Sequence, residues 1–425
     1  MFLIRMGAEL TGREYDGLTA LGIAEIGLLL ANPLRLFTAG FQLSFAAVLG
    51  IYLIGLGNKK GRFSDSVRMS VRLWFFLLPV TLWHYYETCL YAPAWNLLVI
   101  PMASVLLCCG SAGMAVMLIP CGAGDIMQSA LWKITEWILL FYEKGSGLLL
   151  ELPGARWIPG RPRLWQIACY YGVLLFYLWR KRKEKKEGRQ TGKQVVRQLV
   201  TAGILLILLG IPKWKRGQME LTMLDVGQGE SVILTSGGET ALVDCGSSNS
   251  YKDPGGLAAD TLHSMGVREL SAVVVTHYHA DHTNGLYEVL RRIPVQTVYL
   301  PDIEDEYGVR ERLVSLAEEK GAQVTYVTKE TADTLGDTVL TIYPPVQSGG
   351  DLNELGLTAL ASAGDFDLLI TGDMSGSTEK KLVETYALPD IEVLVVSHHG
   401  SRYSSNIRFL KLVTPEAAVI SVGDN

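Results

Sequence analysis

Long apolar stretches dominate the first half of the chain. Several have close to the roughly 20 residues that a helix needs to cross a bilayer. A buried soluble core would break such stretches sooner and interleave charges, so we expect membrane helices. An interrupted stretch at 126–142 contains Lys133 and Glu136, and it either crosses the membrane or lies along its surface. The uninterrupted stretches are 18–37, 41–56, 73–86, 95–120, 164–179 and 195–212.

The pattern changes close to residue 217. Short alternating strands punctuated by glycine follow, and from about residue 257 they alternate with helical stretches. We therefore predict a partial membrane domain of about six or seven helices at 1–216, and at 217–425 a domain of mixed sheets covered by helices. The expected strands are 221–226, 231–235, 240–243, 297–300, 324–327, 339–343, 368–371 and 393–397, and the expected helices are 257–265, 286–293, 309–320 and 379–386.

Charge divides the chain at the same place. Residues 1–216 hold 25 Lys and Arg against 12 Asp and Glu, whereas 217–425 hold 13 against 31. Basic clusters at 59–62 and 180–186 flank apolar stretches, and the positive-inside rule places both in the cytoplasm. The last apolar stretch then leaves 217–425 on the extracytoplasmic side of the cell membrane, against the weaker opposing signal of a basic cluster at 213–216.

Histidine is sparse and clustered. The chain has seven, and five of them lie at 277–282 and 398–399. His277 and His279 directly follow an apolar strand and point the same way, while Asp281 and His282 turn toward a second position. Asp373 follows another apolar strand, and the pair at 398–399 follows a third. Alone, Asp373 would equally serve as a helix cap, but three strand ends that converge on one edge predict a metal site with open coordination.

These motifs resemble known families. His-x-His-x-Asp-His at 277–282, Thr-Gly-Asp at 371–373 and Ser-His-His-Gly-Ser at 397–401 resemble the metallo-β-lactamase superfamily. The segment 224–231 resembles the first strand and turn of the extracellular domain of the ComEC family of competence DNA-uptake proteins. Asn-Pro-Leu at 32–34 and Gly-Phe-Gln-Leu-Ser-Phe at 40–45 resemble that family's membrane domain.

The resemblance implies a multi-pass α-helical membrane domain followed by an α/β domain, an αββα sandwich with its metal site at the sheet edges. It also implies DNA internalisation, nuclease activity in the outer domain, and DNA and other competence proteins as partners. One or two divalent ions, zinc or manganese, would occupy the site. By motif, His277 and His279 hold one metal, Asp281 and His282 hold the other, Asp373 bridges them, and His398 completes the set, with His399 as the alternative.

Further roles follow from the same resemblance. Asp281 and Asp373 are the expected catalytic residues, because a two-metal site could activate a bridging water that Asp281 orients or deprotonates. Asp244, Asp225 and Gln228 are expected to support the ligands, and Arg402, Arg408 and Lys411 to contact DNA.

Some residues depart from the family pattern. The stretch 351–357 lacks the histidine that many superfamily members have there, so the first metal is expected to bind weakly or only one ion to be held. Glu230 replaces the usual Asp of the Gly-Gln-Gly turn, and Cys245 is expected to pack rather than bind metal. We also expect the chain to be incomplete, without the family's usual amino-terminal helices and small β-domain and without its carboxyl-terminal end.

Two other functions remain open. The acidic balance of 217–425 repels a polyanion, since affinity for DNA normally depends on phosphate contacts by Lys and Arg. The chain could therefore be a channel whose outer domain binds metal without catalysis. It could also be a membrane-anchored metallo-hydrolase of small esters, although that reading leaves so many membrane helices without a purpose.

Overall fold

The computed structural model describes residues 2–54, 63–117, 122–186, 194–211, 219–305 and 307–423. Contacts divide the chain into two compact units, Met1–Ile211 and Pro212–Asn425, which are described separately. The basic clusters expected at 59–62 and 213–216 lie outside the described residues, as does the predicted boundary at 216/217.

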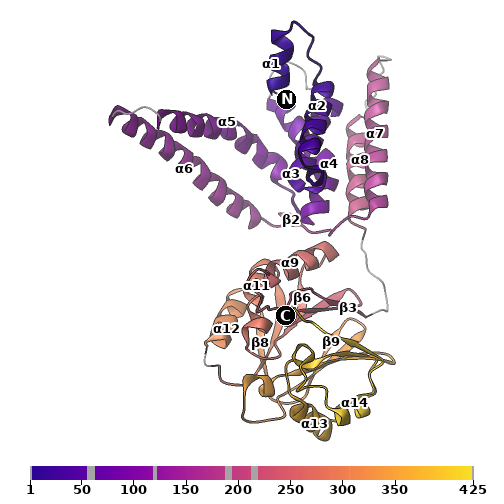
Figure 1. The fold of residues 1–425 in the computed structure, drawn as a ribbon. Helices are drawn as coiled ribbons and strands as arrows, with labels where there is room; N and C mark the ends of the chain where they lie inside the picture. Colours follow the sequence, from indigo (N-terminus) through magenta and orange to yellow (C-terminus); the bar gives the residue numbers. More distant parts are fainter. Residues whose placement is uncertain are drawn as a thin grey trace. The chain divides into compact units, whose positions relative to one another are not determined.

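The first unit is helical, and its helices follow the apolar stretches. The stretch expected at 18–37 is divided at Asn32, because the residue before a proline disfavours helical geometry. Asn32 accepts a hydrogen bond from the N–H of Leu34 and starts the short helix η1 (Pro33–Phe37). The α-helices are α1 (Phe2–Leu10), α2 (Gly17–Ala31), α3 (Ala39–Ile54), α4 (Phe63–Tyr85), α5 (Ala92–Val116), α6 (Gly122–Leu150), α7 (Leu164–Lys186) and α8 (Gln194–Leu209), and the short strands β1 (Thr88–Cys89) and β2 (Arg156–Trp157) pair (Figure 1).

Helices α4 and α7 contact each other at a proline. Pro79 has no N–H for the carbonyl of Phe75, four residues earlier in α4. The hydroxyl of Tyr170 in α7 donates to that carbonyl at 2.5 Å, and Tyr171 donates to the carbonyl of Phe76 at 3.0 Å. These bonds satisfy backbone groups that an apolar environment would otherwise leave unpaired.

Among the described helices, α5 is long and apolar enough to cross a membrane, while α2, α3 and part of α8 are apolar but shorter. The unit also leaves many large apolar side chains exposed, among them Leu107, Met114, Trp137 and Ile207. The multi-pass topology itself stays a prediction.

The second unit contains two six-stranded mixed sheets, as the sequence indicated. Helices α9 (Pro254–Met265), α11 (Leu286–Arg292) and α12 (Val309–Glu319) cover one sheet, and α13 (Gly376–Thr385) and α14 (Ile407–Val413) cover the other (Figure 1). The first sheet has the order β3 (Glu220–Met223), β4 (Val232–Ser236), β5 (Glu239–Val243), β6 (Leu270–Val274), β7 (Val295–Pro301), β8 (Gln323–Val327). The second has the order β14 (Ala417–Val419), β13 (Val393–Val395), β12 (Phe366–Ile370), β11 (Thr358–Ala363), β10 (Thr338–Tyr343), β9 (Thr331–Leu335).

Alternation along the strands builds three apolar layers. In β4, Ile233 faces the helices of its own sheet, whereas Val232 and Leu234 face the second sheet. A third layer joins the outer face of the second sheet to α13 and α14. The result is an αββα sandwich. The sequence did not predict β9, β11 or β14, whose polar or short stretches give a weak alternation signal.

Candidate metal centre

The polar residues predicted as ligands follow strands at the carboxyl ends of both sheets. His277 follows β6, Asp373 follows β12 and His399 follows β13. Backbone hydrogen bonds join these loops: Leu357 of the second sheet donates to the carbonyl of Thr276 of the first at 2.8 Å, and within the second sheet His398 donates to that of Gly372 at 3.1 Å.

Gly372 allows the two sheets to approach at this edge. Its φ is +60°, and an added Cβ would lie 3.0 Å from the side chain of Thr276. A larger residue would therefore be strained both in its backbone and against the neighbouring loop.

Four side chains converge there as a group able to hold a metal ion. One ligand atom from each of Asp281, His282, Asp373 and His399 lies within 4.8 Å of the others. His282 Nε2 is 3.2 Å from Asp373 Oδ1, and His399 Nε2 is 3.6 Å from Asp373 Oδ2. Both nitrogens and Asp373 Oδ1 are buried without a hydrogen-bond partner. Buried polar atoms are normally paired, so this arrangement fits a divalent cation with nitrogen and oxygen ligands.

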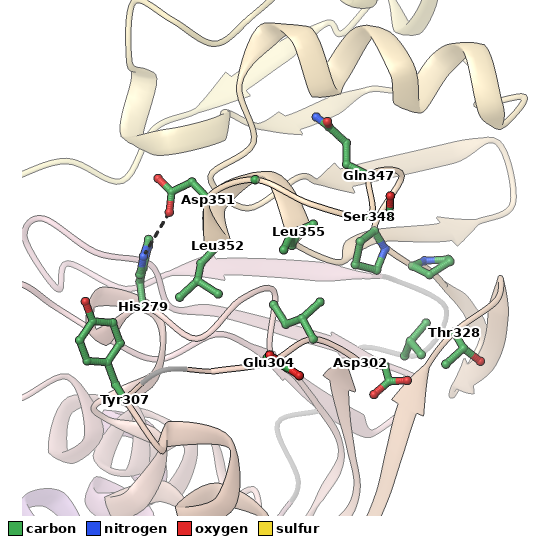
Figure 2. A pocket seen from close by; sticks show the side chains of 15 residues that line it. His279, Asp302, Glu304, Tyr307, Thr328, Gln347, Ser348, Asp351, Leu352 and Leu355 are labelled. Carbon is green, nitrogen blue, oxygen red and sulfur yellow. Dashed lines mark ion pairs between the residues drawn. The ribbon is translucent and has the colours of Figure 1, made fainter.

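His277 and His279 lie beside this group as a pair. His277 Nε2 is 3.2 Å from His279 Nδ1, and the ring centroids of His277 and His282 are 4.1 Å apart. In the described part of the chain no third ligand atom joins the pair at comparable range. Asp351 faces the other side of His279, with its Oδ1 3.9 Å from Nε2 (Figure 2). A first metal at this pair would therefore have two histidine ligands among the described residues.

The structure brings His399, rather than His398, to the site. His399 is buried with its Nε2 3.7 Å from Asp281 Oδ2, while its Nδ1 and the carbonyl of Ser421 are 3.0 Å apart. His398 is half-buried, and its ring centroid lies 6.3 Å from that of His399. Both residues have a φ above +50°, so the chain turns between them and points the two rings apart. His399 is thus the better-placed candidate ligand of the pair.

Asp244, which follows β5, is a buried carboxylate that orients the histidine loop. It accepts hydrogen bonds from the N–H of Thr276 at 2.7 Å and from the Thr276 hydroxyl at 2.6 Å. Its Oδ2 also lies 2.7 Å from His282 Nδ1. This contact fixes the ring so that Nε2 faces the metal position, the usual arrangement for a metal-binding histidine.

The electrostatics of the group favour ionised carboxylates. Burial opposes the charge on Asp373, yet His282 beside it holds the pKa of that carboxyl well below its usual range. Burial likewise opposes protonation of His282, but Asp244 and Asp373 raise its pKa well above the usual value. Burial lowers the pKa of His277, which is therefore neutral. A cation bound at the site would replace the proton on His282.

Two buried acids at the site were not assigned there from the sequence. Glu230 groups with Asp244 and His282, and burial raises its pKa to about 8. Glu379 accepts hydrogen bonds from Ser397 at 2.8 Å and from the N–H of Asn406 at 2.6 Å, and so holds the turn that carries His399. The sequence signal for Glu230 was a charge between a glycine turn and an apolar strand. Glu379 carried no signal beyond an ordinary helical position.

Three other residues near the glycine turn direct their side chains to groups other than the ligands. Asp225 is exposed and pairs with Lys252 at 3.1 Å, so the structure does not bring its side chain to the ligands. Gln228 accepts through its backbone carbonyl from the N–H of Ser248 at 2.7 Å and braces the turn rather than a ligand. The thiol of Cys245 donates to a backbone carbonyl at 3.4 Å, in keeping with packing.

The basic residues after the second histidine pair are exposed but differ in their contacts. Arg402 lies over the ring of Tyr403, with its guanidinium carbon 4.8 Å from the centroid. Arg408 pairs with Glu384 at 2.8 Å, which neutralises much of its charge. Lys411 is exposed on α14. Arg402 and Lys411 are thus better placed than Arg408 to attract an anion.

Replacement of Asp244 by asparagine should weaken metal binding by roughly 10- to 100-fold. The neutral amide would lack the negative charge with which the carboxylate orients His282 through Nδ1. Asp225→Asn is the matched control, since that carboxylate faces solvent. Metal affinity measured by competition with a chelating dye checks this. Equal affinity in the two variants would contradict the role of Asp244.

The two adjacent histidines offer a second comparison. His399→Ala should lower the bound metal per chain, whereas His398→Ala should leave it unchanged, because only His399 faces Asp281 and Asp373. Elemental analysis of the purified variants measures this directly. A loss of metal in the His398 variant alone would reverse the assignment.

Comparison with known families agrees with this geometry. Residues 1–184 match the family described as Competence protein, and residues 224–424 match the Metallo-beta-lactamase superfamily. ComE operon protein 3 of Bacillus subtilis is 24% identical over 96% of this chain and 54% of its own length. Competence protein ComA of Neisseria gonorrhoeae is 28% identical over 52% of this chain and 30% of its own length.

This chain thus spans about half, or less, of the length of these curated relatives. Among solved structures, the metallo-beta-lactamase fold protein YhfI from Bacillus subtilis aligns with 15% identity and a TM-score of 0.35, over 49% of this chain and 88% of that one. The two matched domains and the relatives together cover nearly the whole chain. The chain therefore combines a region that matches the Competence protein family with a region that matches the Metallo-beta-lactamase superfamily, and it is similar along nearly its whole length to ComE operon protein 3.

Proposed function

We propose that the chain is a component of a DNA-internalisation channel. Residues 1–216 form its multi-pass membrane domain, and residues 217–425 form an extracytoplasmic, metal-dependent phosphodiesterase that acts on incoming DNA. The observation that carries the proposal is the convergence of Asp281, His282, Asp373 and His399 on the chain that also has a competence domain. The names of the two relatives support a role in competence.

The ligand set has both nitrogen and carboxylate oxygen atoms, which suits zinc or manganese. A bound ion would polarise a phosphodiester and make a water nucleophilic at neutral pH. His282, fixed by Asp244, and Asp373 hold the position between the two sheets. Asp281 is half-buried at the opening, where it orients the nucleophilic water or accepts its proton.

The surface charge limits how DNA can be held. Residues 217–425 carry 13 basic against 31 acidic side chains, so long-range attraction of a polyanion is absent. Arg402 and Lys411 supply local positive charge, and the metal supplies more. The same acidity favours a second candidate, a hydrolase of small uncharged esters, which differs from the first in its substrate.

Membrane insertion is supported by the surface of the first unit. The exposed large apolar side chains on α5 and its neighbours would drive aggregation in water but suit a bilayer. The basic run at 180–186 lies at the carboxyl end of α7. The chain then returns along α8, so the end of α8 that precedes the second unit is the end away from the basic run. This arrangement favours an extracytoplasmic second unit.

Asp373→Asn should abolish metal-dependent cleavage of DNA without unfolding the domain, because an amide has nearly the same shape but cannot bind cations as an anion. Asp365→Asn, in the exposed turn at the other end of β12, is the control. The measurement is cleavage of single- and double-stranded DNA by the metal-loaded chain, with ester hydrolysis assayed in parallel. If the unmodified chain cuts no DNA above the Asp373→Asn background, the nuclease proposal fails.

A reporter that is active only outside the cytoplasm should be active when it is fused after Arg216. The reason is that the basic count near 180–197 exceeds that at 213–216. Paired fusions to a periplasmic-type and a cytoplasmic-type reporter measure the side. Activity of the cytoplasmic reporter would reverse the proposed sidedness.

A further inference from the structure

A cavity of about 800 Å³ lies beside the candidate metal centre. His279 forms part of its wall, and the remaining wall comes from the loop between β7 and α12, the end of β8, the loop after β10 and the short helix η2 (Leu352–Leu355) (Figure 2). A group held in this cavity would therefore contact a candidate ligand directly. The cavity has room for a nucleotide-sized group next to the scissile bond.

Its lining mixes apolar side chains with carboxylates and other polar groups, among them Gln347, Ser348 and Thr328, and has no Lys or Arg. Apolar side chains include Ile303, Leu352 and Leu355, and Tyr307 lies at the edge (Figure 2). Asp302, Glu304 and Asp351 supply negative oxygen atoms. A phosphate would be repelled there, whereas a flat, uncharged ring that donates hydrogen bonds would fit.

The carboxylates are not equally available. Asp351 lies 3.9 Å from His279 Nε2, and Asp302 lies 3.4 Å from Arg310. Glu304 is exposed and has no ion-pair partner among the described residues. Glu304, with Asp302 beside it in the loop, is therefore the main hydrogen-bond acceptor for a ligand.

We infer that this cavity receives one nucleobase of the substrate strand and selects a base with an exocyclic amino group, such as cytosine, over uracil or thymine. The inference rests on the proposed phosphodiesterase function. A carboxylate accepts a hydrogen bond from the cytosine N4 amino group, but it is repelled by the carbonyl oxygen at the same position of uracil. The apolar part of the wall accommodates any unstacked base, so the preference depends on the polar side chains, of which the carboxylates carry the charge.

This binding mode also answers the electrostatic difficulty of the acidic domain. Nucleic acid held mainly by phosphate contacts loses affinity steeply as salt rises. The affinity gained by inserting an uncharged base into the cavity depends little on salt. An acidic domain can therefore hold a strand through a base and the metal site.

The test compares oligo(dC) with oligo(dU), which differ in the amino or carbonyl group at position 4 and in N3, which carries a hydrogen in uracil only. Fluorescence anisotropy with the metal-loaded full chain in detergent measures binding of phosphorothioate versions, which are hydrolysed slowly, and ordinary phosphodiester versions measure cleavage. Oligo(dC) should bind about fivefold more tightly than oligo(dU). Glu304→Gln combined with Asp302→Asn should bring the ratio close to one, because an amide can donate to the uracil carbonyl.

Glu318→Gln, an exposed acid on α12 outside the cavity, is the matched control and should leave the ratio unchanged. Equal affinity for the two oligonucleotides, no binding of either, or a ratio that the double variant does not alter would overturn the inference. Preferential binding without cleavage of either oligonucleotide would support the cavity assignment and refute the proposed nuclease function, so the two failures are distinguishable.

Discussion

The buried carboxylate of Asp244 is the contact on which the candidate site depends. Isolated burial of a carboxylate is costly, but three groups from the histidine loop, the Thr276 N–H, the Thr276 hydroxyl and His282 Nδ1, contact it within 2.7 Å. Asp244 thereby joins the end of β5 to the loop after β6. That loop in turn accepts the hydrogen bond from Leu357 of the second sheet, so one acid aligns both halves of the sandwich.

A second buried acid, Glu379, holds the ligand-bearing turn of the other sheet, as Asp244 holds the histidine loop of the first. Glu379 accepts hydrogen bonds from Ser397 and from the backbone of Ser405 and Asn406, on both sides of the turn that contains His399. The left-handed backbone of that turn is unfavourable for histidine and persists because these contacts hold both of its ends. Buried acids thus hold the loops that carry the candidate ligands: Asp244 holds the loop of His282, and Glu379 holds the turn of His399.

The two units differ in the kind of side chain that they expose. The helical unit presents apolar side chains outward and satisfies its backbone internally, as Tyr170 does for the carbonyl freed by Pro79. The sandwich has buried apolar layers and an acidic exterior, and its acidity makes phosphate contacts a weak source of affinity. In the proposed function, the metal centre and the adjacent cavity would let such a domain hold a polyanion through its bases.

The sequence by itself determined the two-part organisation, the mixed sheets covered by helices and the histidine cluster, because hydrophobic period and motif spacing are local properties. The αββα class came from the resemblance of its motifs to the metallo-β-lactamase superfamily. It could not choose between His398 and His399, since that choice depends on backbone dihedrals maintained by Glu379. It also placed Asp225 at the site, whereas Glu230 is the acid that lies beside His282. The packing of the two sheets decides which side chains of a turn face inward. When one face of the turn is buried between the sheets, the side chains on its other face are left in solvent.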